Sequence, residues 1–234
     1  MADVDHRLAG VMAPPVSEQA KERDALLWPG PSPATLPRVT LPLRLTVLST
    51  SLDPVSRSRW MTGLAAAQLR EAGHDVTLLD LRETPLPLFD NDACYAHPHA
   101  ELYHRAIREA DGVFLGVPVY NWGLGAGVKN LVELTGSTDP ERGLSGAWFD
   151  RVVTFLVSGG LNHGYLSHGA LTFGLMTDFR CVINPHFAYA TSAEWAADGV
   201  PGEWLAERLA RTVERGVDLA ARLKDRPYRS VWEV

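Results

Sequence analysis

The chain has 234 residues, of which 46% are hydrophobic and 21% charged, as in an ordinary soluble globular protein that can bury a substantial core. Its net charge of −6 argues against a nucleic-acid partner, because attraction to phosphates depends on Lys and Arg. The two cysteines, Cys94 and Cys181, are far apart, which excludes a disulfide framework and a paired-cysteine zinc or redox motif and fits a reducing cytoplasm. The first residues are acidic where a secretory signal is basic, and no apolar run approaches the roughly 20 residues that span a bilayer, so we expect neither export nor a membrane partner.

Residues 1–41 are expected to form an arm and not a domain. Proline recurs there, and it removes backbone donors and resists regular structure. The prolines are Pro14, Pro15, Pro29, Pro31, Pro33 and Pro37. Two interpretations stay open: a disordered tail, or an arm that packs Leu26, Leu27 and Trp28 on its own or a neighbouring subunit.

From residue 42 to residue 234 the pattern alternates between strand and helix. Strands are expected at 44–49, 74–79, 112–117, 151–157 and from 181, and helices at 59–72, 99–110, 127–134, 166–177 and 201–223. The segment 112–117 is uncharged and rich in β-branched residues, as expected of a strand buried on both faces, and we expect Pro118 to end it. Strands separated by helices predict an α/β fold: a three-layer flavodoxin-like domain with a five-stranded parallel sheet and helices on both faces.

The loop after the first strand is rich in hydroxyl groups and leads directly into a helix. Ser51, Ser56 and Ser58 offer hydroxyls there, and Arg57 or Arg59 offers a cation. Unpaired amides and the helix dipole attract an anion, so the loop is a candidate phosphate site. A serine-capped helix on a solvated loop is the alternative. Neither the G-x-G-x-x-G fingerprint nor a Walker motif is present, which argues against a dinucleotide Rossmann site and an NTPase.

Two further loops follow the third and fourth strands. The first contains Pro118, Val119, Tyr120, Asn121 and Trp122, whose backbone can contact a planar heterocycle. The second contains Ser158, Gly159, Gly160 and His163, and its glycines allow close approach of a ligand or simply mark a turn. The three loops converge in this topology, which favours an FMN site. His163 either contacts the flavin or its substrate, or caps the following helix.

Three motifs together carry a family resemblance. The pattern Ser51-x-x-x-x-Ser56-Arg57-Ser58, then Pro-x-Tyr-Asn at 118–121 with Lys-Asn at 129–130, then Ser-Gly-Gly at 158–160, resembles the NAD(P)H-dependent FMN reductase family of flavodoxin-like proteins over about residues 43–189. The resemblance implies that Ser51, Ser56 and Ser58 hold the FMN phosphate, that 118–122 lines the flavin ring and that 158–160 closes its other edge. It also implies NADPH or NADH as hydride donor and a homodimer or homotetramer.

The resemblance predicts an oxidoreductase that passes electrons to free flavin, a quinone or another small-molecule acceptor. Asp53 and Trp122 depart from the family pattern, and Trp122 is open to three roles: stacking on the ring, narrowing the nicotinamide site, or packing between subunits. The alternatives are an electron carrier, a flavoprotein dedicated to one biosynthetic substrate, and a flavin-free scaffold. No side-chain acid or base is assigned, and no metal site is expected, because His97, His99 and His104 lack a completing ligand. Trp60, Trp148 and Trp195 are interpreted as packing residues.

Overall fold

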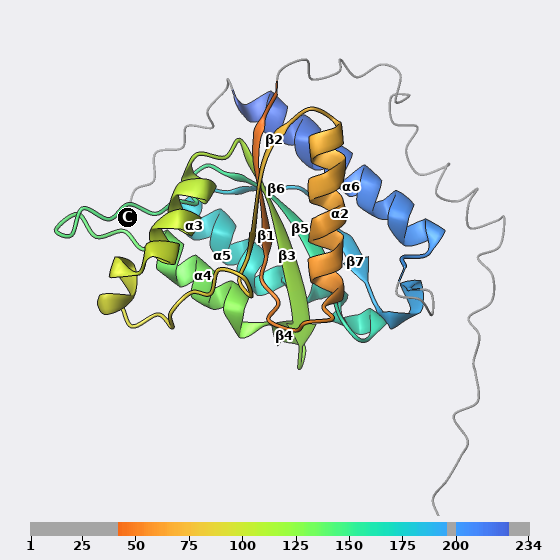
Figure 1. Ribbon diagram of the computed structural model, residues 1–234, viewed down its shortest axis with the longest axis horizontal. Coiled ribbons are helices and arrows are strands. Elements are labelled where there is room, and N and C mark those ends of the chain that lie inside the picture. The colour runs from red at the N-terminus through yellow and green to blue at the C-terminus, as the bar shows by residue number, and fades with distance from the viewer. Residues whose placement is uncertain (1–41, 196–199, 225–234) are drawn as a thin grey trace, which may run out of the picture. The chain divides into compact units, whose positions relative to one another are not determined.

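The computed structural model describes residues 42–195 and 200–224, and the predicted arm at 1–41 lies outside the described residues. One twisted sheet runs through the described part, in the order β2-β1-β3-β5-β6 (Figure 1). Its strands are β1 (Arg44–Ser49), β2 (Asp75–Asp80), β3 (Gly112–Tyr120), β4 (Gly123–Leu124), β5 (Val152–Ser158), β6 (Val182–Ile183) and β7 (Ala188–Ala190). All pairings are parallel except that of β4 with β3. The chain first moves from β1 outward to β2 and then crosses back to β3, on the other side of β1. The place between β1 and β3 where the direction of crossing reverses is the switch point of the predicted flavodoxin-like order.

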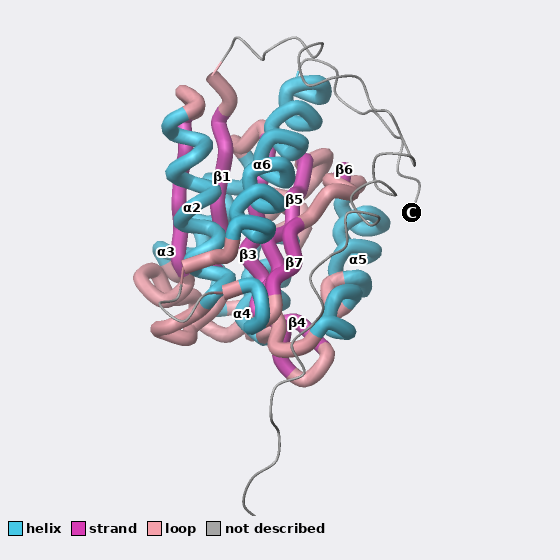
Figure 2. The backbone as a smooth tube through the Cα atoms, turned by 90° about the vertical axis from the view of Figure 1, so that its right-hand side faces the viewer, coloured by secondary structure: helices cyan, strands magenta, loops and turns pink. Residues whose placement is uncertain are grey.

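Helices cover both faces of this sheet, as predicted. They are α2 (Arg57–Glu71), α3 (Pro98–Arg108), α4 (Ala126–Gly136), α5 (Gly169–Phe179) and α6 (Glu203–Lys224), with 3₁₀ turns η2 (Ala93–Ala96), η3 (Asn162–Leu166) and η4 (Ser192–Glu194). Helices α2 and α6 lie on one face of the sheet, and α3, α4 and α5 lie on the other (Figure 2). Side chains of each group form a hydrophobic cluster with the sheet. Right-handed crossovers place α2 on one face, because the chain moves from β1 to β2, and place α3, α4 and α5 on the other, because the chain then moves in the opposite direction from β2 to β3, β5 and β6.

The sheet has seven strands, and the predicted number of five was wrong. The expected fifth strand is split into β6 and β7, which both pair with β5, and the interruption falls at Asn184 and Pro185. Proline lacks the amide that a ladder needs. The second addition is β4, a two-residue strand that folds back on the end of β3.

Pro118 does not end the third strand, contrary to expectation. The strand continues to Tyr120, with Pro118 in register with Ser158 of β5. The pairing with β1 stops at Gly116 and that with β4 begins at Val119, so Pro118 lies between these two ladders, where the missing proline amide is tolerated. The strand thereby carries its last residues beyond the body of the sheet.

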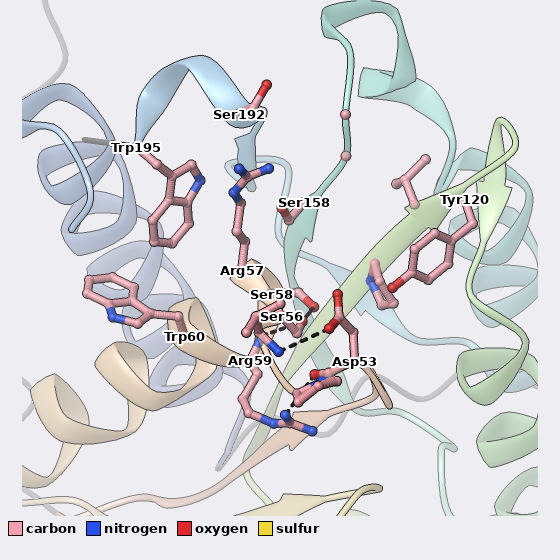
Figure 3. Close-up of a pocket in the computed structure, with 16 residues that line it drawn as sticks. Asp53, Ser56, Arg57, Ser58, Arg59, Trp60, Tyr120, Ser158, Ser192 and Trp195 are labelled. Atoms are coloured by element: carbon pink, nitrogen blue, oxygen red, sulfur yellow. Dashed lines mark hydrogen bonds between the residues drawn. The ribbon is translucent and has the colours of Figure 1, made fainter. Parts of the chain in front are cut away.

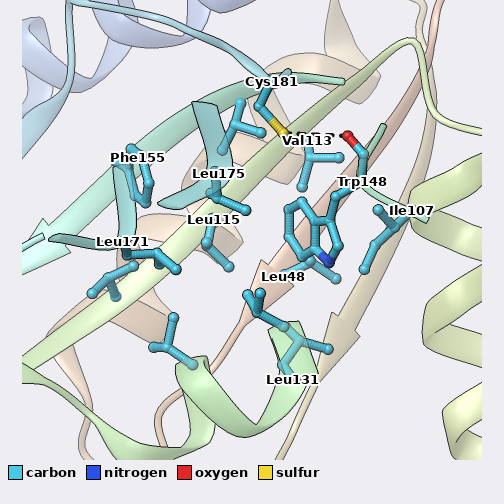
Figure 4. Close-up of a cluster of buried hydrophobic side chains, with 14 of the residues drawn as sticks. Leu48, Ile107, Val113, Leu115, Leu131, Trp148, Phe155, Leu171, Leu175 and Cys181 are labelled. Atoms are coloured by element: carbon cyan, nitrogen blue, oxygen red, sulfur yellow. Dashed lines mark hydrogen bonds between the residues drawn. The ribbon is translucent and has the colours of Figure 1, made fainter. Parts of the chain in front are cut away.

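The larger hydrophobic cluster lies under α3, α4 and α5 (Figure 4). Trp148 is fully buried there, and its indole N–H donates to Thr135 Oγ1 at 2.8 Å. Cys181 packs beside it, and burial raises the pKa of its thiol to about 12. Both residues are therefore structural, and the packing role predicted for Trp148 is confirmed.

Close packing of α2 on β3 fixes the position of the helix that follows the first loop. A side chain at Gly116 would clash with the Thr62 methyl group of α2, and it would also lie 3.4 Å from the Ser58 carbonyl oxygen. The absence of a Cβ at Gly116 lets the helix approach the strand, which places the start of α2 directly above the end of β1. The spacing of Trp204, Leu205 and Leu209 in the sequence predicts one apolar face of α6; Leu205 and Leu209 are buried, but Trp204 is exposed and lies off that face.

Candidate functional site

The loop between β1 and α2 ends in a serine cap. Ser56 is the N-cap residue of α2, and its hydroxyl accepts from the Arg59 amide at 3.2 Å. The same hydroxyl lies 3.0 Å from that of Ser58, which is 1% exposed. The first N–H groups of a helix have no intrahelical acceptor, so this end of α2 presents amides and hydroxyls together. The arrangement suits a phosphate.

Arg59 holds this loop from behind. Its guanidinium donates to the Asp80 carboxylate at 2.5 and 3.0 Å, to the Asp53 carbonyl at 2.8 Å and to the Ser51 carbonyl at 2.8 Å. Hydrogen bonding to Asp80 raises the pKa of Arg59 further above its usual value. Since four of its five N–H donors are engaged by the protein, Arg59 mainly shapes the loop.

The end of β3 and the start of β4 form a two-residue hairpin turn. Tyr120 pairs with Gly123, and the two residues between them have positive φ angles, 48° at Asn121 and 65° at Trp122. Two positive φ values identify a type I′ turn, which is unfavourable for a side chain as bulky as tryptophan. Strain of this kind is often found where a site requires a fixed backbone. Trp122 stacks on His163 of the third loop, with ring centroids 4.7 Å apart and planes at 21°.

The third loop wraps around the hydroxyl of Tyr189, which donates to the Leu161 carbonyl at 2.5 Å. A Cβ at Gly159 or at Gly164 would come within 2.6 Å of that hydroxyl, so these two glycines serve the packing of Tyr189. Gly160 differs, because a Cβ there would meet nothing within 4 Å. His163 does not cap α5, whose N-cap is His168, so that alternative was wrong.

These three loops line one cavity of about 910 Å³ (Figure 3). Of the predicted site residues, it is lined by Ser56, Arg57, Ser58, Pro118, Val119, Tyr120, Ser158, Gly159 and Gly160. Asn121 and Trp122 line an adjoining cavity of about 370 Å³ that shares Val119, Tyr120 and Gly160 with the first.

Ser51 and His163 line neither cavity. Ser51 is buried, and its hydroxyl accepts from the Asp53 amide at 3.3 Å. His163 reaches the site only through its contact with Trp122. Both side chains therefore touch the loops that form the cavity walls.

The sequence interpretation missed several lining residues. Trp60, Ser192 and Trp195 line the larger cavity, and Tyr189 lines the smaller, although Trp60 and Trp195 had been assigned to packing. Trp60 stands four residues after the N-cap of α2, and that proximity was the available signal. The position of Trp195 depends on the fold of the β7–α6 connection, which no local pattern reveals.

The residues present fit a flavin mononucleotide. A volume near 910 Å³ lies within the range of small-molecule and cofactor sites, and its two ends differ in chemistry as FMN does. The α2 end offers hydroxyls and amides, and the β3 end offers Val119, Tyr120 and the hairpin backbone. The Asp53 carboxylate accepts from the Val55 amide at 3.0 Å, which ties it to its own loop.

The sequence matches the model of the NADPH-dependent FMN reductase family over residues 43–196. The chain belongs to this family. Membership confirms that it is a flavin-dependent oxidoreductase, with FMN and NAD(P)H as its cofactors. No curated protein matches the chain.

Solved structures of other flavoproteins share the fold of this FMN reductase family member at low identity. FerB, a flavoenzyme NAD(P)H:(acceptor) oxidoreductase from Paracoccus denitrificans, has a TM-score of 0.61 at 19% identity, with 77% of this chain and 98% of FerB covered. The apo form of the NADH:FMN oxidoreductase EMOB gives 0.58 at 13% identity, covering 76% and 89%. RosB, solved with the bound intermediate 8-demethyl-8-formylriboflavin-5'-phosphate, gives 0.59 at 17% identity, covering 82% and 90%. Across residues 42–195 and 200–224, no helix combines the length and apolar character needed to cross a membrane.

Proposed function

We propose that the protein takes hydride from NAD(P)H onto FMN and passes the electrons to a small-molecule acceptor such as free flavin or a quinone, in the cytoplasm. The observation that carries the proposal is the meeting of three loops, after β1, β3 and β5, in one cavity at the carboxyl edge of the sheet. Ligands of open α/β sheets bind at this edge, next to the switch point. The family match supports a flavin oxidoreductase, and the identity of the electron acceptor is our own proposal.

Different residues of the site bind different parts of FMN. Ser56 and Ser58, with the first amides of α2, hold the phosphate, and the exposed Arg57 adds positive charge to this end of the cavity without a direct contact to the two serines. The segment 118–122 lines the ring, and 158–160 closes its other edge. Ser51 and His163 act indirectly: Ser51 shapes the phosphate loop, and His163 supports Trp122.

When bound, FMN supplies the hydride-accepting and electron-donating chemistry, so this chain needs no acid or base of its own. The residues of the chain bind the flavin and orient it. Asn121 and Trp122 line the ring-end cavity, and we propose that backbone N–H groups of this strained turn stabilise negative charge at the polar edge of the ring. The preorganised turn keeps the cost of reorganisation low.

An exposed apolar surface supports a homodimer or homotetramer. It comprises Leu161, Tyr165, Leu166, Phe173 and Met176, on η3, α5 and the loop before them, and each of these side chains is at least 44% exposed. Patches of this kind mark interfaces, and a second copy is the occupant that we propose. Replacing Phe173 with Lys should dissociate the oligomer in light scattering after gel filtration, whereas Leu88→Lys, an equally apolar exposed position elsewhere, should not. A wild-type monomer would contradict this part of the proposal.

A second candidate is a flavoprotein dedicated to one substrate. Trp122 favours it, because this indole lines the ring-end cavity of about 370 Å³ and limits what can approach there. Rapid oxidation of NAD(P)H with many unrelated acceptors would argue against the dedicated enzyme, and Trp122→Ala should broaden the acceptor range if the indole restricts it.

The test is an absorbance spectrum of the protein mixed with FMN, followed without oxygen as NADPH and then NADH are added. Bleaching of the flavin band at catalytic protein concentration supports the reductase and gives its donor preference. Bound flavin that neither nucleotide reduces moves the assignment to a carrier or a dedicated enzyme. Absence of flavin binding refutes the proposed function.

A further inference from the structure

The larger cavity extends beyond what an FMN phosphate requires. Its far end is formed by Trp60, Trp195, Ser192 and Arg57, which we call the tryptophan corner. The indoles of Trp60 and Trp195 meet edge to face, with centroids 5.1 Å apart and planes at 85°, so they form two walls at right angles. Trp60 lies on the first turns of α2, directly beside the phosphate loop. The corner therefore adjoins the phosphate end of the proposed flavin site.

Two polar groups in this corner lack partners. The Trp195 indole N–H is buried and makes no hydrogen bond. The Arg57 guanidinium points away from Ser56 and Ser58 toward Ser192 and Trp195 (Figure 3), and no residue in the described part of the chain forms a hydrogen bond or ion pair with it. A buried donor without an acceptor is unfavourable, so a ligand that supplies one is stabilised.

Simple packing explains only part of this arrangement. Trp195 does pack against the cluster under α2 and α6. Packing does not account for an indole that also lines a cavity, keeps an unpaired N–H and stands beside an unpaired arginine. An aromatic wall, one N–H donor and one cation match the parts of a nucleotide: its base, its acceptor atoms and its phosphate.

We propose that the tryptophan corner binds an adenylate, the AMP half of a dinucleotide. The adenine ring stacks on an indole face and Arg57 pairs with the phosphate, and a turn of the Trp195 ring toward the cavity lets its buried N–H donate to a base or ribose acceptor. An adenylate group occurs in two kinds of dinucleotide that could bind here. It can be joined to the flavin phosphate, as in FAD, or it can belong to NAD(P)H. The inference rests on the proposed function, because the corner is an extension of the flavin site.

The first measurement uses AMP as the probe and needs no flavin. Calorimetric titration of the flavin-free full chain should show AMP binding, and Trp60→Leu and Trp195→Leu should each weaken it by about tenfold. Trp204→Leu is the matched control, because Trp204 is an exposed tryptophan of α6 that lines neither cavity. Should the indole variants fail to fold, Ser192→Asp, at an exposed position, should weaken AMP more than adenosine by repelling the phosphate.

The second measurement identifies the source. Tighter binding of FAD than of FMN, with the ratio lost in Trp60→Leu, supports FAD. An unchanged FAD-to-FMN ratio with a raised KM for NADPH and an unchanged kcat supports the nicotinamide dinucleotide. Absence of AMP binding, together with an unaltered flavin ratio and KM in every variant, overturns the inference. AMP binding without any flavin binding leaves the corner in place and refutes the proposed function instead.

Discussion

Replacing Arg59 tests whether the phosphate loop is held by geometry or by charge. Arg59 makes four hydrogen bonds, two to Asp80 and one each to the carbonyls of Asp53 and Ser51. The Arg59 and Asp80 side chains are 22% and 16% exposed, so their ion pair lies between the surface and the buried case. We expect Arg59→Gln to lower the free energy of unfolding by about 2 kcal/mol. Arg59→Lys keeps the charge but cannot reproduce the planar fork, and should cost about 1 kcal/mol.

The consequence for FMN separates the two explanations. If Arg59 acts by shaping the loop, both variants should weaken FMN by about tenfold, because the Ser56 and Ser58 hydroxyls lose their fixed positions. The assay is quenching of flavin fluorescence on titration, with urea denaturation for stability and Arg105→Lys, on an exposed site of α3, as the control. A double-mutant cycle with Asp80→Asn should give a coupling energy of about 1–2 kcal/mol. Full FMN affinity in Arg59→Lys, together with weaker binding and a reduced salt dependence in Arg59→Gln, would refute the reasoning and make Arg59 a direct phosphate ligand.

Three further outcomes are expected. Ser58→Ala should weaken FMN by about 1–3 kcal/mol while leaving riboflavin affinity unchanged, because the lost hydroxyl serves the phosphate; equal losses for both flavins in the fluorescence titration would contradict this. Gly116→Ala should lower unfolding free energy by about 1–3 kcal/mol in urea, since its methyl group meets Thr62, whereas Gly63→Ala, with nothing within 4 Å, should be neutral or stabilising. Burial lowers the pKa of His168 below 6.5, so the unfolded chain binds more protons below that pH; stability should be full above it and fall as pH decreases through the folded pKa, and His168→Phe should reduce the slope.

The strands and helices that could be predicted are those whose burial leaves a pattern in the sequence. The strands β3 and β5 are buried over most of their length and read as uninterrupted apolar runs. The split of the last strand into β6 and β7 was harder to predict from the sequence, because it depends on the pairing of both pieces with β5 on either side of Pro185. The continuation of β3 through Pro118 depends on where β1 ends, which is a tertiary fact.

The loops of the site were identified by sequence, but the positions of their side chains were not. Hydroxyls before a helix predicted the phosphate end, and the structure brings Ser56 and Ser58 together there. The sequence offered Arg57 and Arg59 as equivalent cations, whereas the structure ties Arg59 to Asp80 and leaves Arg57 without a partner. This difference between Arg57 and Arg59 depends on the carboxylate of Asp80, which lies 21 residues from Arg59 in the chain and ends the neighbouring strand β2.

Each loop of the site is held by a contact that is complete without a ligand. Arg59 fixes the loop after β1, the type I′ turn and its pairing with β4 fix the loop after β3, and the Tyr189 hydroxyl fixes the loop after β5. A flavin therefore meets walls whose backbone order has already been established by folding, which lowers the entropy cost of binding. Within the part of the chain that the structure describes, Arg57 and the Trp195 N–H have no partners, and both residues line the same end of the cavity. Preorganisation of the flavin site does not explain why these two groups lack hydrogen-bond partners within the protein. Their lack of partners is the strongest reason to test whether a second group binds at this end of the cavity.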